Sequence, residues 1–240
     1  MIKVSAEVAN PDLQAKMRLL LARDGRLHIP NFLDDAFARS LLSAFSDIDW
    51  TTTYRTSEGG MLGRARELAA LDAGARERML ASIHHYAGEA FQYYFDTYRV
   101  SHLHERGLLQ EGVLAEFCAG LNSEGAIALF AAITGDARIR CLDAQATRYT
   151  QGQFLLEHDD RDGEDARLFA YVLNLTPRWK PDWGGLLMFI DEQGQVQRAI
   201  APRWNALNIF KVPQRHAVSF VTPFAKGARY SITGWMRTRP

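Results

Sequence analysis

The sequence has little of what marks a secreted or membrane-bound protein. Only two of its 240 residues are cysteines, Cys118 and Cys141, and neither belongs to a CxxC motif. A disulfide framework and a structural zinc site are therefore not expected. The longest apolar run covers residues 126–133, far fewer than the roughly 20 residues of a membrane span. Residues 1–23 are interrupted by charges and lack the apolar core of a signal peptide.

An excess of charge of one sign is also lacking. Lysine and arginine together number 28, as do aspartate and glutamate, so the formal net charge is zero. A neutral chain has no overall field that would draw it onto nucleic acid or an anionic membrane. We therefore expect a cytoplasmic protein with no membrane partner, and a nucleic-acid partner is disfavoured. The sequence indicates no oligomeric state.

The composition, with 47% apolar and 23% charged residues, is ordinary for a globular protein. The length suits one ample domain, and neither a repeat nor a linker divides the chain. We expect a single domain over residues 1–240, with a helical support region at 1–138 and a strand-rich core at 139–240.

The two regions differ in periodicity. In the first, apolar residues recur at three- and four-residue intervals, which predicts helices at 11–22, 34–45, 75–98 and 123–135, with a short strand at 27–29. In the second, short apolar runs alternate with turn residues, which predicts strands at 141–149, 169–175, 185–190, 206–210, 217–221 and 230–236. This pattern favours a mainly β fold with flanking helices, in which a jelly-roll core is braced by the N-terminal helices.

Two histidines and one aspartate have the spacing of a metal site. His158 and Asp160 are two residues apart, so in a strand they would share one face while Asp159 points to the other. His216 directly precedes the predicted strand 217–221. Two imidazoles and one carboxylate can occupy one face of octahedral Fe(II) and leave three coordination positions open. A structural zinc site would need a fourth ligand, which the pattern does not supply.

An arginine follows the second histidine. Arg229 and Ser231 share one face of the last predicted strand, and no acidic residue adjoins Arg229 in the sequence. A guanidinium and a hydroxyl that project inward together are suited to bind a carboxylate. We therefore expect Arg229 to point into the barrel on the side of the metal ligands.

In these residues the sequence from about 145 to 237 resembles the 2-oxoglutarate/Fe(II)-dependent dioxygenase superfamily, in particular its prolyl 4-hydroxylase-like branch. The resemblance rests on the following motifs: His158-x-Asp160, His216, Arg229-x-Ser231, Gly234-Trp235, Tyr149-x-x-Gly152 and Trp183-Gly184-Gly185. It implies a double-stranded β-helix with iron at His158, Asp160 and His216. It also implies that Arg229 binds the C5 carboxylate of 2-oxoglutarate, with Tyr149 and Ser231 beside it.

The resemblance further implies a reaction. Fe(II), 2-oxoglutarate and O₂ would be used to hydroxylate a prolyl or other amino-acid substrate, peptidyl or free, with release of succinate and CO₂. Ascorbate is a further candidate cofactor. In related halogenases a small residue replaces the metal carboxylate, so the presence of Asp160 favours hydroxylation.

Two other functions stay open. A nucleic-acid demethylase of the same superfamily usually shows a second arginine in a Thr-Phe-Arg ending, where this sequence has Gly234-Trp235-Met236-Arg237. A non-enzymatic metal-binding jelly-roll module would have no need for an inward arginine beside the metal ligands.

Other histidines and aromatic residues have less specific patterns. His102-x-His104 has the same-face spacing of a strand, and His84-His85 lie in the predicted helix 75–98. Neither pair has a third ligand and an arginine downstream, so we interpret both as surface histidines. We interpret the aromatic residues within 91–98 as helical packing against the barrel. Loops at 51–63, 151–166 and 177–183 are predicted to surround the barrel mouth and to determine the substrate.

Overall fold

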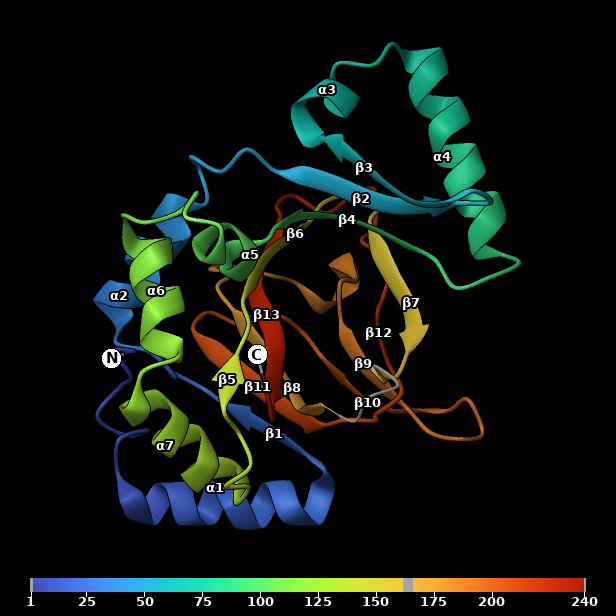
Figure 1. The fold of residues 1–240 in the computed structure, drawn as a ribbon. Coiled ribbons are helices and arrows are strands. Elements are labelled where there is room, and N and C mark those ends of the chain that lie inside the picture. Colours follow the sequence, from blue (N-terminus) through green and yellow to red (C-terminus); the bar gives the residue numbers. More distant parts are fainter. Residues whose placement is uncertain (1, 162–165, 240) are drawn as a thin grey trace.

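The computed structural model describes residues 2–161 and 166–239. Figure 1 shows its elements in chain order. The helices are α1 (Pro11–Asp24), α2 (Asp35–Ala44), α3 (Ala65–Ala69), α4 (Ala73–Ala87), α5 (Val100–Glu105), α6 (Val113–Leu121) and α7 (Glu124–Thr134). The strands are β1 (Arg26–Ile29), β2 (Thr51–Thr56), β3 (Gly59–Arg64), β4 (Tyr93–Tyr98), β5 (Cys141–Leu142), β6 (Gln145–Tyr149), β7 (Phe154–His158), β8 (Arg167–Asn174), β9 (Leu187–Ile190), β10 (Val196–Ile200), β11 (Ala206–Lys211), β12 (His216–Val218) and β13 (Arg229–Arg237).

Ten of the described strands form an antiparallel sheet in the order β1-β11-β8-β13-β6-β4-β7-β12-β9-β10, and β2, β3 and β5 pair outside this order. The sheet curls into a half-barrel, so that β7, β12 and β9 face the wall made by β8, β13 and β6 (Figure 1). Phe189 of β9 and Phe210 of β11 join the two walls, with ring centroids 5.2 Å apart. The predicted mainly β, jelly-roll architecture with flanking helices is confirmed.

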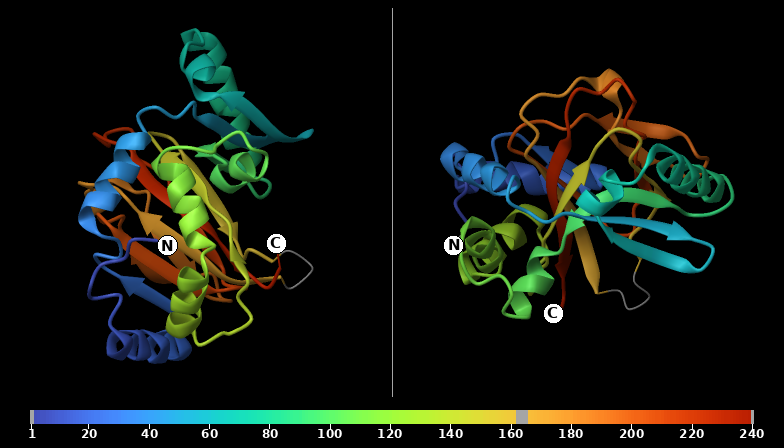
Figure 2. Two further views of the ribbon diagram at one scale, coloured as in Figure 1. Left: turned by 60° about the vertical axis from the view of Figure 1, so that its left-hand side comes forward. Right: turned by 90° about the horizontal axis from the view of Figure 1, so that it is seen from above.

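Helices α1, α2, α6 and α7 cover the outer face of the β8–β13 wall (Figure 2). Leu41, Phe117 and Phe130 of these helices are buried in one apolar cluster with Leu173 of β8 and Ile232 of β13. The inner face of the same wall is left to line the cavity. Among the described residues no single helix is long and apolar enough to cross a membrane; α6 and α7 together meet that requirement only as a pair bent by 60°.

The helix termini follow from local sequence. Asn10 caps α1 by accepting a hydrogen bond from the Asp12 backbone N–H, and Gly25 ends the helix in the left-handed conformation. Ser123 and Gly135 do the same for α7. The predicted helices at 11–22, 34–45 and 123–135 and the strand at 27–29 are therefore confirmed, with small shifts at their ends.

The predicted helix at 75–98 is wrong in its second half. Helix α4 ends at Ala87, and Tyr93–Tyr98 form strand β4 in the middle of the sheet. Aromatic residues and threonine favour a strand there, and the segment pairs with residues of β2, β6 and β7 far along the chain. The aromatic residues therefore belong to the barrel wall and do not pack against it from a helix. The region up to residue 138, predicted as helical support, also contributes β1 to β4 to the sheet.

Other expectations are corrected in the same way. Residues 51–63 are not a loop, because they form most of the β2–β3 hairpin. The predicted strand 141–149 is interrupted at residues 143–144, and His102 and His104 lie in helix α5. Helix α6 and strand β10 have no counterpart in the sequence prediction. Of the predicted loop 151–166, residues 162–165 lie outside the described residues.

Candidate active site

The structure brings His158, Asp160 and His216 together inside the half-barrel. His158 ends β7, His216 begins β12, and the two residues face each other across the strand pair with ring centroids 4.1 Å apart. Each Nε2 lies 3.5 Å from an oxygen of Asp160. The three possible ligand atoms all lie within 4.8 Å of one another. Two imidazole nitrogens and a carboxylate oxygen in this arrangement suit a divalent metal such as Fe(II).

The reason for this convergence differs from the predicted strand alternation. Leu155 pairs with Val218 and His158 with His216, so three steps along β7 match two along β12. This β-bulge places both Leu155 and His158 on the cavity side. Asp160 lies beyond the strand and reaches the histidines through a left-handed backbone with φ of 64°. Its neighbour Asp159 instead pairs with Arg161 at the surface.

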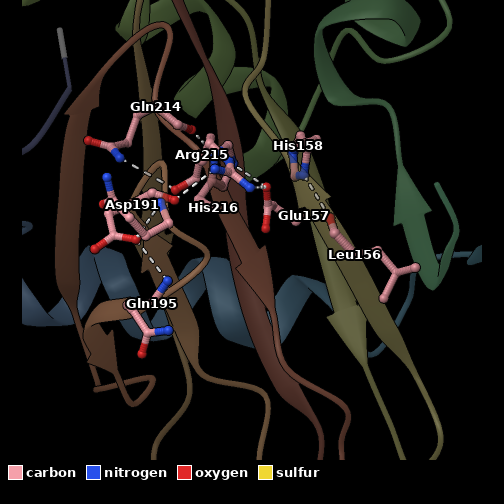
Figure 3. A network of polar contacts seen from close by, with 9 residues as sticks. Leu156, Glu157, His158, Asp191, Gln195, Gln214, Arg215 and His216 are labelled. Atoms are coloured by element: carbon pink, nitrogen blue, oxygen red, sulfur yellow. Dashed lines mark hydrogen bonds and ion pairs between the residues drawn. The ribbon is translucent and has the colours of Figure 1, made fainter.

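Backbone carbonyls fix the orientation of both imidazoles. The Nδ1–H of His158 donates to the Leu156 carbonyl at 3.0 Å, and the Nδ1–H of His216 donates to the Gln214 carbonyl at 2.7 Å. Each histidine thus bonds the residue two positions before it, as Figure 3 shows. This leaves both Nε2 atoms as acceptors directed toward Asp160, the arrangement that metal-binding histidines need.

The charges of the three residues are coupled. Burial, with a smaller effect from a charge on His158, lowers the pKa of His216 to about 4 against the opposing effect of Asp160. For His158, burial also lowers the pKa, but the hydrogen bond and charge of Asp160 outweigh it, so its pKa is raised. Burial raises the pKa of Asp160, but the two histidines outweigh it and hold the pKa below the ordinary value. A neutral His216 and an ionised Asp160 are the forms that bind a metal.

Arg229 is the largest fully buried side chain of the protein's described part, with 2% of its surface exposed. Its guanidinium carbon lies 4.9 Å from the ring centre of Tyr149, its cross-strand partner on β6. Burial lowers the pKa of Arg229, while contact with Tyr149 acts in the opposite direction, and its Nε has no hydrogen-bond partner. Among the described residues no carboxylate pairs with Arg229. A buried cation without a counter-charge is costly, so this end of the cavity is suited to an anionic ligand.

Two glycines form the turn beside the Arg229 side chain. Gly184 and Gly185 have φ of 70° and 62°. A Cβ on Gly184 would lie 1.9 Å from the Phe220 carbonyl oxygen, and one on Gly185 would lie 3.4 Å from Cδ of Arg229. The positive φ of both residues favours glycine, and at Gly184 a side chain would collide with the Phe220 backbone, so this turn beside Arg229 depends on glycine.

Tyr149 and Ser231, the other two predicted binding residues, differ in their contacts. Burial raises the pKa of Tyr149 to about 12, so its hydroxyl remains a hydrogen-bond donor beside Arg229. Ser231 is fully buried on the same inner face as Arg229, but its hydroxyl lies 2.9 Å from that of Thr147. The structure adds Thr97 and Asn174 to this cross-strand row, and each of them has a buried oxygen without a partner. Their inward positions depend on strand pairings that the sequence alone does not reveal.

One cavity of about 590 Å³ contains both the histidine–aspartate cluster and Arg229. One wall of the cavity, from its mouth inward, is a series of aromatic rings. They belong to strand β4 and to Phe91, two residues before it. Phe91 lies 5.7 Å from the His158 ring and 5.9 Å from Tyr93, and Phe95 lies 6.0 Å from Tyr93 and 5.1 Å from Tyr149. Sequence reasoning missed this wall because it assigned these residues to a helix.

Two histidines and one carboxylate beside a buried arginine in one cavity are the side chains typical of non-haem Fe(II) oxygenases. Comparison with known families agrees, because residues 144–237 match the model of the 2OG-Fe(II) oxygenase superfamily. The matched part of the chain is similar to 2OG-Fe(II) oxygenase domains, and it contains all six predicted site residues. The predicted resemblance is thereby confirmed.

The curated relatives are prolyl hydroxylases. Over 103 residues the chain is 36% identical to prolyl 3-hydroxylase OGFOD1 of Xenopus laevis. The aligned region covers 40% of this chain and 20% of that protein. The chain is also 36% identical over 107 residues to prolyl 3-hydroxylase sudestada1 of Drosophila melanogaster, covering 39% and 19%. The match thus spans about a fifth of the length of these relatives.

Solved structures share the fold over nearly the whole chain. A Pseudomonas putida prolyl-4-hydroxylase superposes with a TM-score of 0.59 at 20% identity, covering 95% of this chain and all of that one. A Trichoplax adhaerens prolyl hydroxylase in complex with a hypoxia inducible factor peptide fragment gives a TM-score of 0.64 at 17% identity, covering 96% and 91%. The double-stranded β-helix expected from the resemblance is therefore the fold of this protein.

Proposed function

We propose that this protein is an Fe(II)- and 2-oxoglutarate-dependent dioxygenase that hydroxylates a prolyl residue of a peptide or protein, with release of succinate and CO₂. The observation that carries the proposal is Arg229, a buried guanidinium without a counter-charge in the cavity that also holds the histidine–aspartate cluster. A metal site alone would not need it. A dicarboxylate that reaches from the metal to Arg229 uses both features.

His158, Asp160 and His216 would hold Fe(II), and their donor set fits this ion. When bound, the iron supplies the chemistry of O₂ activation, coupled to decarboxylation of 2-oxoglutarate. The chain's own residues orient and enclose the reactants. Arg229 and the neutral Tyr149 hydroxyl bind the far carboxylate, which sets the direction in which 2-oxoglutarate lies. Apolar side chains such as Leu187, Phe210 and Val218 line the cavity and limit access of water.

The mouth of the cavity supports a prolyl substrate. Phe91 is 38% exposed although its ring lies 5.7 Å from the ring of the metal-site residue His158. Together with Tyr93 and Leu62, both of which line the cavity, it offers an apolar and aromatic surface beside the reaction site. A pyrrolidine ring fits such a surface without needing a charged partner. The names of the relatives include both 3- and 4-hydroxylases, so the proposal leaves the hydroxylated carbon open.

The test is a turnover assay with proline-containing peptides. Protein loaded with Fe(II) is incubated with 2-oxoglutarate, O₂ and a peptide library, and products are sought by mass spectrometry. We expect a gain of one oxygen on a prolyl residue, with one succinate formed for each hydroxylation. Protein with Asp160→Ala serves as the matched control. Succinate release without any oxidised peptide would contradict the prolyl assignment, and no 2-oxoglutarate turnover with any substrate would contradict the enzyme.

A further inference from the structure

Two charged residues lie next to the metal-site histidines along the chain. Glu157 directly precedes His158, and Arg215 directly precedes His216. Their side chains meet on the outer face of the β7–β12 pair, where Nε of Arg215 donates to a carboxylate oxygen of Glu157 at 2.5 Å (Figure 3). A second guanidinium nitrogen also contacts this carboxylate.

Arg215 also contacts the turn that follows β9. Its Nη1 donates to the Asp191 carbonyl at 2.7 Å, and its own carbonyl accepts from the Ile190 N–H at 3.0 Å. The Asp191 carboxylate accepts from the backbone N–H groups of Gln193 and Gln195, at 3.0 and 2.8 Å, which fixes the turn after β9. Arg215 therefore ties the end of β7 to a rigid turn through one planar guanidinium.

The pair lies at an irregularity of the strand ladder between β7 and β12. Glu157 belongs to the β-bulge between Leu155 and His158, so its segment of β7 is not in regular register with β12. Beyond the bulge the backbone contact is long, with the Gln214 N–H 3.4 Å from the Asp159 carbonyl oxygen. The backbone pairing around His158 and His216 is thus irregular on one side and long on the other.

We propose that the Glu157–Arg215 ion pair is a positioning device, which holds the bulged end of β7 against β12 and so sets the distance between the two metal-site histidines. This inference rests on the proposed metal site and concerns residues that touch neither metal nor substrate. Because both side chains are more than a third exposed, with 38% and 37% of their surfaces accessible, the effect is modest. We expect loss of either charge to weaken metal binding about threefold to tenfold, less than the 10- to 100-fold typical of direct partners of metal ligands.

The experiment measures metal binding and not turnover. Co(II) is titrated into wild-type protein and into the variants Arg215→Ala, Glu157→Gln and Arg215→Lys without 2-oxoglutarate, and both the dissociation constant and the visible Co(II) spectrum are recorded. The single-charge variants are expected to bind more weakly and to show a changed spectrum, since the ligand geometry relaxes. Arg215→Lys is expected to fall between them and wild type, because an ammonium cannot bond Glu157 and the Asp191 carbonyl in the way a planar guanidinium does.

A matched control comes from another surface ion pair. Arg138 bonds Asp136 with two guanidinium nitrogens at 3.0 and 2.7 Å, and neither residue lines the cavity, so Arg138→Ala should leave both Co(II) readouts unchanged. The exchanged pair, Glu157→Arg with Arg215→Glu, should recover part of the lost affinity. Thermal melts of all variants separate an effect on the site from loss of the fold.

The outcomes distinguish the inference from the proposed function. If wild-type protein binds Co(II) and the Arg215 and Glu157 variants match it in affinity and spectrum, the positioning role is wrong while the metal site stands. If the protein with the exchanged pair binds Co(II) no better than the single variants, the contact between Glu157 and Arg215 does not position the histidines. If wild-type protein binds no Co(II), both the inference and the proposed metal site fail.

Discussion

Removal of the Arg229 guanidinium should selectively weaken 2-oxoglutarate binding. The side chain is buried, its Nε has no partner, and Tyr149 is its close aromatic neighbour. A charge-assisted hydrogen bond to a carboxylate contributes about 1.5–3 kcal/mol. Its loss in Arg229→Ala therefore corresponds to about a 10- to 150-fold weaker interaction with 2-oxoglutarate. Metal affinity should change little, because Arg229 is not a ligand.

The assay is a titration of 2-oxoglutarate against succinate release, accompanied by calorimetric binding to Mn(II)-loaded protein, which does not depend on turnover. Arg229→Lys should recover only part of the loss, because a point charge cannot reproduce the bidentate fork. Arg99→Ala is the matched control, since Arg99 lines the same cavity but is exposed at its rim. An unchanged KM and binding constant in Arg229→Ala would refute the cosubstrate assignment even if the metal site proved real.

A second substitution at Arg229 should affect the free energy of unfolding. Arg229→Met keeps the apolar stem of the side chain and removes a buried charge without a counter-charge. Burying an ion without a counter-charge costs roughly several kcal/mol, so its removal from the ligand-free protein should be neutral or stabilising. Arg229→Met should thus unfold at no lower a denaturant concentration than wild type without ligands. A clearly destabilised variant would show that the guanidinium has a structural partner.

Three further predictions concern other residues. Asp160→Ala should abolish 2-oxoglutarate turnover while Asp159→Ala keeps most of it, because Asp160 faces the histidines and Asp159 pairs with Arg161 at the surface; equal losses in succinate release would contradict the geometry. Phe91→Ala should raise the KM for a peptide substrate severalfold and leave that for 2-oxoglutarate unchanged, whereas Phe220→Ala, an exposed aromatic residue outside the metal cavity, should change neither. The buried Tyr149 has a pKa of about 12, above the ordinary value of about 10, so its contribution to stability falls as the pH rises above 10. In denaturant unfolding between pH 9 and 11, wild type should lose about 1 kcal/mol more than Tyr149→Phe; equal losses would mean that Tyr149 is not buried in its neutral form.

The sequence could predict the chemistry of the site because the residue types themselves are informative. His158, Asp160, His216 and Arg229 were identified from spacing and from the resemblance, and the structure brings them into one cavity. Their types and spacing can be read from the sequence without knowledge of the backbone conformation. The helices with clear caps, such as α1 and α7, were predicted for a similar reason, because each cap is a local feature.

The sequence could not predict features that depend on distant partners. Apolar spacing continued without a break from α4 into residues 91–94, and only pairing with β6 and β7 makes Tyr93–Tyr98 a strand. The β7 bulge and the left-handed Asp160 likewise arise from the match between β7 and β12. Strand alternation predicts that His158 and Asp160 share a face, whereas the structure brings them together through the β-bulge and the left-handed backbone of Asp160.

The most direct test of the central claim is a crystal structure of the protein with Mn(II) in place of Fe(II), together with 2-oxoglutarate. The account predicts one metal ion with Nε2 of His158, Nε2 of His216 and an oxygen of Asp160 at about 2.0–2.3 Å. It also predicts the far carboxylate of 2-oxoglutarate on the Arg229 guanidinium, beside the Tyr149 hydroxyl. A metal bound away from these three residues, or a 2-oxoglutarate that leaves Arg229 without a carboxylate, would contradict it.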